Sequence, residues 1–95
     1  MLKKKLRWTH LAIEDMNNIK RTISEDNPSA AENVIKTIRN KIERLKDFPT
    51  SGRVVPEFRS PALREVIVPL YRVVYRVVSS EIHILRVWHS KQEIK

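Results

Sequence analysis

Glu57, Arg72 and His89 are the side chains with the most informative chemistry, because together they can cleave RNA without a metal. A carboxylate can take the proton from a 2′-hydroxyl, and a guanidinium can stabilise the charge that develops on the phosphate. An imidazole can then protonate the departing 5′-oxygen. Each residue also has a structural interpretation. Glu57 can be a solvated loop acid, Arg72 can pair with Glu65 across a sheet, and His89 can cap a strand end or pack on Trp88.

Other kinds of catalytic site have no motif in this sequence. There is no G-x-S-x-G nucleophile motif, no glycine-rich phosphate loop and no H-E-x-x-H zinc motif. The chain has no cysteine, and its three histidines, His10, His83 and His89, do not have the spacing of metal ligands. We therefore expect neither a metal nor a cofactor.

The length and the hydropathy of the chain limit its class. The 95 residues are enough for one domain, which we expect to cover residues 1–95. No apolar run approaches ~18 residues, so no segment is expected to span a membrane. The basic N-terminus, MLKKKLRW, has no apolar stretch behind it and is unlike a secretory signal. The sequence therefore predicts one cytoplasmic domain without membrane contact.

The formal net charge of +8 is unevenly distributed. Residues 1–8 carry four basic groups and no acid, and residues 49–95 carry eight basic and four acidic groups. Residues 9–48 are neutral, with seven groups of each sign. A polarised basic surface suits an anionic partner, which can be RNA, DNA or an acidic protein. The alternative is an excess of charge that only keeps the protein soluble.

The N-terminal half predicts one strand followed by two helices. Alternation of apolar and basic residues predicts a strand over residues 3–8, with Leu6 and Trp8 facing inward. Thr9 is suited to cap a helix that runs to about Ser24, and Asn27-Pro28 is suited to start a second helix that ends near Lys46. The expected apolar stripes are Ala12, Met16, Ile19 and Ile23 in the first helix, and Ala31, Val34, Ile35, Ile38, Ile42 and Leu45 in the second.

The C-terminal half predicts a loop and three strands. Residues 47–63 hold three of the five prolines and the single glycine, which indicates a long irregular loop. Strands are expected over residues 64–68, 71–78 and 81–88, the last two joined by a tight turn at Ser79-Ser80. The order β-α-α-β-β-β predicts an α+β two-layer sandwich, with a helical hairpin packed on one face of a mainly antiparallel four-stranded sheet.

The tight turn also predicts which side chains share a face. With an unbroken register, Val78 pairs with Glu81 and Arg72 pairs with Val87. The face toward the helices then holds Tyr71, Val73, Tyr75, Val77, Ile82, Ile84, Arg86 and Trp88. The other face holds Arg72, Val74, Arg76, Val78, Glu81, His83, Leu85, Val87 and His89, with Lys3, Lys5 and Arg7 beside them. Arg86 fits poorly among core residues, so we expect it to reach past the sheet edge or to pair with an acid. The mixture of arginines and aliphatic residues on the second face indicates a surface that a partner covers.

Six segments in order resemble the RelE/ParE family of bacterial toxins along nearly the whole chain. They are W-T-x-x-A at 8–12, N-P-S-A-A at 27–31, F-P-x-x-G-R at 48–53, R-E-V-I-V at 64–68, Y-R-V-V-Y-R-V at 71–77 and I-L-R-V-W-H at 84–89. The resemblance implies the β-α-α-β-β-β fold. It also implies a toxin of a type II toxin–antitoxin system, made beside a cognate antitoxin that wraps and silences it.

The resemblance leaves two targets open. ParE-like members inhibit DNA gyrase, and the segments at 27–31 and 84–89 look more like ParE. RelE-like members cut messenger RNA on the ribosome, and Arg72 matches the arginine that they use on phosphate. Glu57 and His89 are also placed like the catalytic glutamate and histidine of a nuclease in this family. Residues 90–95 lack the tyrosine or the strongly basic tail that many RelE-type nucleases carry, which favours gyrase inhibition.

Two further sets of residues follow as candidates. Nucleic-acid or partner binding is expected at Lys3, Lys5, Arg7, Arg53, Arg59, Arg64, Arg72 and Arg76. Contact with the antitoxin is expected at Val74, Leu85 and Val87.

Overall fold

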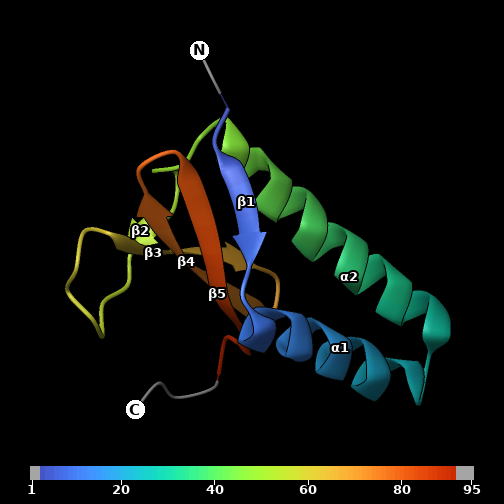
Figure 1. Cartoon of the computed structure of the whole chain (residues 1–95). Coiled ribbons are helices and arrows are strands. Elements are labelled where there is room, and N and C mark those ends of the chain that lie inside the picture. Colours follow the sequence, from blue (N-terminus) through green and yellow to red (C-terminus); the bar gives the residue numbers. More distant parts are fainter. Residues whose placement is uncertain (1–2, 92–95) are drawn as a thin grey trace.

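Two helices cover one face of a single sheet in the computed structural model, which describes residues 3–91 (Figure 1). The elements are β1 (Lys5–Trp8), α1 (His10–Ser24), α2 (Pro28–Glu43), a 3-10 turn η1 (Arg44–Lys46), β2 (Arg53–Val54), β3 (Leu63–Val68), β4 (Tyr71–Val78) and β5 (Glu81–His89). The strand order is β1-β5-β4-β3-β2. β1 lies parallel to β5, and the other neighbours are antiparallel. The predicted α+β two-layer architecture is confirmed. The last part of the 90–95 segment, residues 92–95, lies outside the described residues.

The sheet has five strands where the sequence predicted four. The additional strand is β2, which lies inside the expected loop and pairs Arg53 with Glu65 and Val54 with Arg64. Two residues between proline-rich stretches carry no alternation, so the sequence offered no periodic signal for this strand. β2 matters for the candidate site because it places Arg53 beside Glu65.

The helices begin where their capping residues predict. The Thr9 hydroxyl accepts a hydrogen bond from the amide of Ala12 at 3.2 Å, and the Asn27 side chain accepts one from the amide of Ala30 at 3.1 Å. These side chains satisfy amides that have no partner within the helix. The Thr9 hydroxyl also lies 2.9 Å from the carbonyl oxygen of Ile84, so the start of α1 is fixed to β5.

The core lies between the helices and one face of the sheet. Buried residues of both predicted stripes pack against the inward-facing residues of β3, β4 and β5. They are Ala12, Met16, Ile38, Ile42 and Leu45 from the helical segments, with Val66, Val68, Tyr71, Val73, Tyr75, Ile82, Ile84 and Val87 from the strands. Tyr75 and Ile84 therefore face the helices, as predicted. The opposite face of β4, which carries Arg72, Val74 and Arg76, is called the open face below.

Tyr75 ties the segment before β2 to the core. Its hydroxyl donates to the carbonyl oxygen of Pro49 at 2.8 Å and accepts from the amide of Gly52 at 3.0 Å. Burial raises the pKa of this phenol. A Cβ atom on Gly52 would lie 2.5 Å from the carbonyl oxygen of Glu65 and 2.6 Å from the Tyr75 hydroxyl. The glycine of the F-P-x-x-G-R segment is thus explained by a close backbone approach that a side chain would prevent.

A β-bulge in β5 changes which side chains share a face. Val74 pairs with Arg86 and Tyr75 pairs with Ile84, so Leu85 is an extra residue in β5. Arg72 consequently pairs with Trp88, and the predicted pairing of Arg72 with Val87 is wrong. The prediction assumed an unbroken register, and one extra residue moves every later side chain of the strand to the other face.

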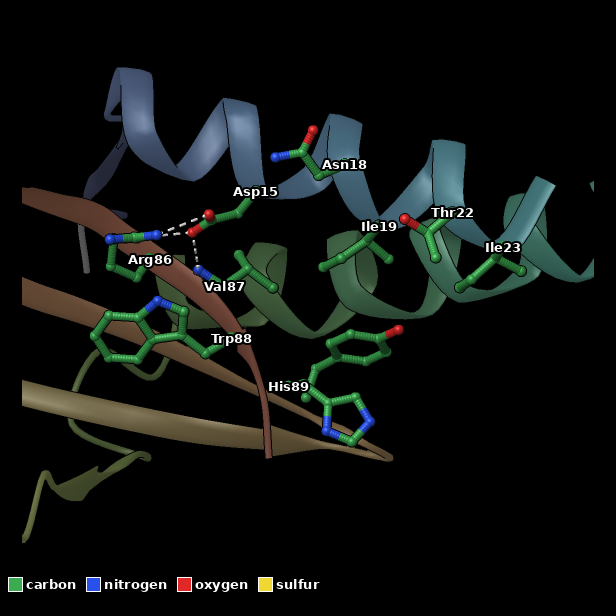
Figure 2. A pocket seen from close by; sticks show the side chains of 10 residues that line it. Asp15, Asn18, Ile19, Thr22, Ile23, Arg86, Val87, Trp88 and His89 are labelled. Atoms are coloured by element: carbon green, nitrogen blue, oxygen red, sulfur yellow. Dashed lines mark hydrogen bonds and ion pairs between the residues drawn. The ribbon is translucent and has the colours of Figure 1, made fainter. Parts of the chain in front are cut away.

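Asp15 of α1 holds the segment of β5 after the bulge. Its carboxylate accepts from Arg86 Nε at 2.9 Å, from Arg86 Nη2 at 3.0 Å and from the amide of Val87 at 2.9 Å (Figure 2). The carboxylate also raises the pKa of Arg86. The expectation that Arg86 pairs with an acid is therefore confirmed. Because β1 pairs with β5 only as far as Ile84, Asp15 takes over at the point where the strand partner ends.

We predict that Gly52→Ala destabilises the domain by about 3 kcal/mol or more, because the contacts it creates include backbone that cannot move aside. Urea unfolding followed by tryptophan fluorescence measures this, with Ser51→Ala at the neighbouring exposed position as the control. A urea unfolding curve of Gly52→Ala equal to that of the parent would show that this close approach does not exist.

We predict that Asp15→Ala destabilises the domain by about 2–3 kcal/mol, because it leaves the Val87 amide and the Arg86 guanidinium without their acceptor. The matched control is Glu14→Ala, since the Glu14 carboxylate lies at the surface, 3.6 Å from His10. Equal unfolding free energies for the two variants would contradict a stabilising contact between Asp15 and β5.

Candidate functional site

Arg72 lies at the centre of a cluster of ion pairs on the open face. Its Nε donates to Glu65 Oε1 at 2.7 Å, and its Nη2 lies 2.5 Å from the same oxygen. Its Nη1 and Nη2 also donate to the two carboxylate oxygens of Glu57, at 3.1 and 3.0 Å. Arg53 Nε donates to the other oxygen of Glu65 at 2.6 Å. We call Arg53, Glu57, Glu65 and Arg72 the Arg72 cluster. Its formal charges sum to zero, and each guanidinium is held by a carboxylate.

The buried part of the Arg72 cluster has a structural role. Glu65 is 1% exposed and Arg72 is 7% exposed, so neither charge is solvated. A buried carboxylate that loses its cation is strongly destabilising, which makes both arginines necessary to Glu65. The pairing of Arg72 with Glu65 that the sequence suggested is therefore present, together with the contact from Glu57.

The environment of Glu57 opposes a role as a general base. The hydrogen bond from Arg72 is the largest of the causes that lower the pKa of this carboxyl below its ordinary value of 4.5. The same contact raises the pKa of Arg72. A general base is most effective when its pKa lies near the working pH, so a carboxylate with a lowered pKa takes protons weakly.

His89 lies on the side of the helices, away from the Arg72 cluster. It pairs with Tyr71, and the two rings meet edge to face with centroids 5.5 Å apart. Tyr71 belongs to the core under the helices. His89 and Tyr71 line an open groove of about 430 Å³ between α1 and the end of β5, together with Asp15, Ile19 and Ile23 (Figure 2).

The three candidate catalytic residues are therefore divided between two faces. Glu57 and Arg72 are in contact on the open face, whereas the predicted position of His89 on that face is wrong. The physical reason is the bulge at Leu85, which reverses the alternation for residues 86–89. The side chain that shares the row of Arg72 is Trp88.

The residues expected to contact an antitoxin differ in accessibility. Val87 is 3% exposed and packs in the core with its partner Val73, so its predicted place on the open face is wrong for the same reason. Val74 lies on the open face as predicted but is 1% exposed. Leu85, the extra residue of the bulge, is half-buried.

The basic residues of the candidate surface are largely engaged within the chain. Arg7 Nε donates to Glu81 at 2.8 Å, and His83 Nε2 lies 3.0 Å from the same carboxylate. These two contacts lower the pKa of Glu81, the contact with His83 being the larger cause. The remaining contacts are Lys3 with Asp47 at 3.5 Å, Arg64 with the carbonyl oxygen of Gly52 at 2.9 Å, and Arg53 with Glu65. Lys5, Arg59 and Arg76 lie exposed, Arg59 in the left-handed backbone region at φ 51°.

Two apolar residues flank Arg72, and the sequence analysis missed both. Ile67 of β3 pairs with Arg72 and is 48% exposed, and Trp88 pairs with it from β5. The guanidinium of Arg86 lies 5.0 Å from the centre of the Trp88 ring. Three strands thus contribute one row, Ile67-Arg72-Trp88, across the open face. The signal that could have revealed it was Arg86, whose charge did not fit the face that an unbroken register assigned to it.

Residues 3–91 form neither a metal site nor a membrane-spanning helix. No group of three or more acidic or histidine side chains in this part of the chain is arranged to hold a metal ion. No helix formed by these residues has the length and apolarity needed to cross a membrane.

Comparison with known proteins gives one consistent result. Residues 6–94 match the family described as ParE toxin of type II toxin-antitoxin system, parDE. The protein Y4kP of Sinorhizobium fredii is 33% identical over 96 residues, with 98% of this chain and 95% of that protein covered. Toxin RelE2 of Caulobacter vibrioides is 31% identical over 84 residues, which cover 87% and 91% of the two chains. A structure of the chromosomal ParDE system from P. aeruginosa has a TM-score of 0.77 at 23% identity, with 92% and 96% coverage.

We predict that the Glu57 carboxyl titrates below 4.5, because it binds a proton less readily while Arg72 holds it. The stabilisation from this pair is then present above the ordinary pKa and is lost as the pH falls through the lower folded-state pKa. A titration of the Glu57 side-chain carbon by NMR measures the value. A midpoint at or above 4.5 would show that the Arg72 contact is not formed in solution.

Proposed function

Because this chain belongs to the ParE toxin family of type II toxin–antitoxin systems, we propose that it arrests growth by binding and inhibiting DNA gyrase. A cognate antitoxin silences it by covering its surface. Gyrase and antitoxin are both protein partners, so the proposed activity is molecular recognition and involves no chemical step. The proposed site of action is the cytoplasm.

The observation that carries this proposal is the division of Glu57, Arg72 and His89 between two faces. Cleavage of RNA by this trio needs a base, a phosphate ligand and an acid around one nucleotide. His89 instead packs on Tyr71 beside the α1 groove, while Arg72 is occupied by two carboxylates. The arrangement therefore favours a binding protein over a nuclease.

The charge distribution supports the same choice. A protein that binds a nucleic-acid backbone needs several cations that can reach successive phosphates. Here Arg7, Arg53 and Arg72 are each paired with a glutamate on or beside the open face. The Ile67-Arg72-Trp88 row, in which Ile67 is exposed and Trp88 half-buried beside the buried Arg72, instead has the composition of protein interfaces, where aromatic residues and arginine are enriched.

Ribosome-dependent cleavage of messenger RNA is the alternative. Two assays with the purified protein separate it from gyrase inhibition. One follows DNA supercoiling by gyrase, and the other maps cuts in messenger RNA during translation in vitro. We expect loss of supercoiling without new cuts. Site-specific cuts with normal supercoiling would overturn the proposal in favour of the nuclease.

We predict that His89→Gln leaves growth arrest within about twofold of the parent, because the proposed mechanism transfers no proton. A general acid contributes ~10²-fold or more, so a nuclease that used His89 would lose most of its activity. Growth arrest after induction is the measurement, and His83→Gln on the open face is the matched control. Loss of arrest in His89→Gln alone, with the variant still folded and still bound by the antitoxin, would show that the imidazole acts in the mechanism.

A further inference from the structure

We propose that Glu57 is an exchangeable internal ligand of Arg72, and that a carboxylate on an acidic segment of the antitoxin replaces it when the complex forms. The proposal rests on the partner-binding function above, and it adds where and by what chemistry that partner binds. It concerns the two outer nitrogens of the Arg72 guanidinium, of which Nη1 is bonded to Glu57 and Nη2 is shared between Glu57 and Glu65.

Arg72 is fixed in the orientation that such a ligand needs. Its Nε and Nη2 both contact Glu65 Oε1, and the side chain is 9% exposed, so the guanidinium keeps its place when Glu57 leaves. The two nitrogens bonded to Glu57 form the planar fork that binds a carboxylate through two parallel hydrogen bonds. The site is therefore preorganised, which reduces the entropy lost on binding.

The two glutamates on Arg72 are not equivalent. The Glu65 side chain is 0% exposed and stands on β3, where it also holds Arg53. The Glu57 side chain is 36% exposed and stands on the irregular segment between β2 and β3. Removal of Glu65 would leave buried arginine without its partner, whereas Glu57 can return to water. Exchange is thus expected at Glu57 alone.

The charges of the Arg72 cluster indicate a carboxylate as the incoming ligand. With Glu57 in place the cluster is neutral, and without it Arg53, Glu65 and Arg72 leave one positive charge. One carboxylate restores neutrality in the geometry that Glu57 already shows. The neighbours in the row, Ile67 and Trp88, are apolar, which suits a protein segment whose acid stands beside apolar side chains.

Exchange has a measurable consequence for affinity. A partner that must displace Glu57 binds only the fraction of molecules in which Arg72 is released, so the internal ligand weakens its binding. Glu57→Gln removes the charge of the internal ligand while keeping its size. We expect this variant to bind the antitoxin about tenfold more tightly than the parent does. Arg72→Ala is a poor probe, because it would also leave Glu65 buried beside a single cation.

Glu81→Gln is the matched control. It makes the same change of charge on the same sheet, at the start of β5, where Glu81 contacts Arg7 and His83. A general gain from added positive charge would appear in both variants, whereas release of Arg72 would appear only in Glu57→Gln. We expect Glu81→Gln to change the affinity by less than about twofold, as for an exposed pair.

The test uses the full chain and the product of the adjacent antitoxin gene, with dissociation constants measured by calorimetric competition. Each acidic residue of the antitoxin is changed to its amide in turn. The proposal expects one such change to abolish the tenfold gain of Glu57→Gln, as a double-mutant cycle requires for a direct exchange. Equal gains in Glu57→Gln and Glu81→Gln, or no gain in Glu57→Gln, would overturn it.

Two further measurements distinguish this proposal from RNA binding at Arg72 and from the proposed inhibition of gyrase. Binding of a short single-stranded RNA is measured for the same variants, and a gain there without a gain for the antitoxin would overturn the choice of a carboxylate. Gyrase supercoiling is measured without antitoxin. Failure to inhibit gyrase, with the tenfold gain still present, would reject the gyrase target and leave the exchange at Arg72 supported.

Discussion

The extra residue in β5 is the constraint on which the arrangement of the candidate site depends. Leu85 breaks the pairing between β4 and β5, so that Arg72 shares its row with Trp88 and Tyr71 shares its row with His89. The bulge coincides with the end of β1, where α1 begins and Asp15 binds the amide of Val87. β1 pairs with β5 as far as Ile84, and beyond the bulge the Asp15 carboxylate of α1 binds β5 at Val87.

The second constraint is the pairing of buried charges within the sheet and at its edge. The net charge of +8 describes the sequence, but several of its arginines meet carboxylates that lie far away along the chain. Arg72 with Glu57 and Glu65, and Arg86 with Asp15, are the most buried of these contacts. The surface that remains combines paired arginines with exposed apolar residues. Such a surface is suited to a protein partner that brings its own acids, because apolar side chains lie beside arginines that include the exposed Arg76.

The features that the sequence predicted correctly depend on local chemistry. Thr9 and Asn27 cap the helices because capping needs only the neighbouring amides, and Ser79-Ser80 closes the hairpin because a turn is local. The features that it did not predict depend on distant partners. β2 has two residues and no periodicity of its own, and Leu85 is an apolar residue in an apolar strand. The misfit of Arg86 in the predicted core was the one local sign that the register changes.

The central claim is that the bulge separates His89 from the Arg72 cluster, so that no acid–base trio is assembled. Nuclear Overhauser contacts of the His89 imidazole protons in the free protein test it most directly. The account predicts contacts with the ring of Tyr71, which meets the imidazole edge to face. Contacts with the side chains of Arg72 or Glu57 would contradict it.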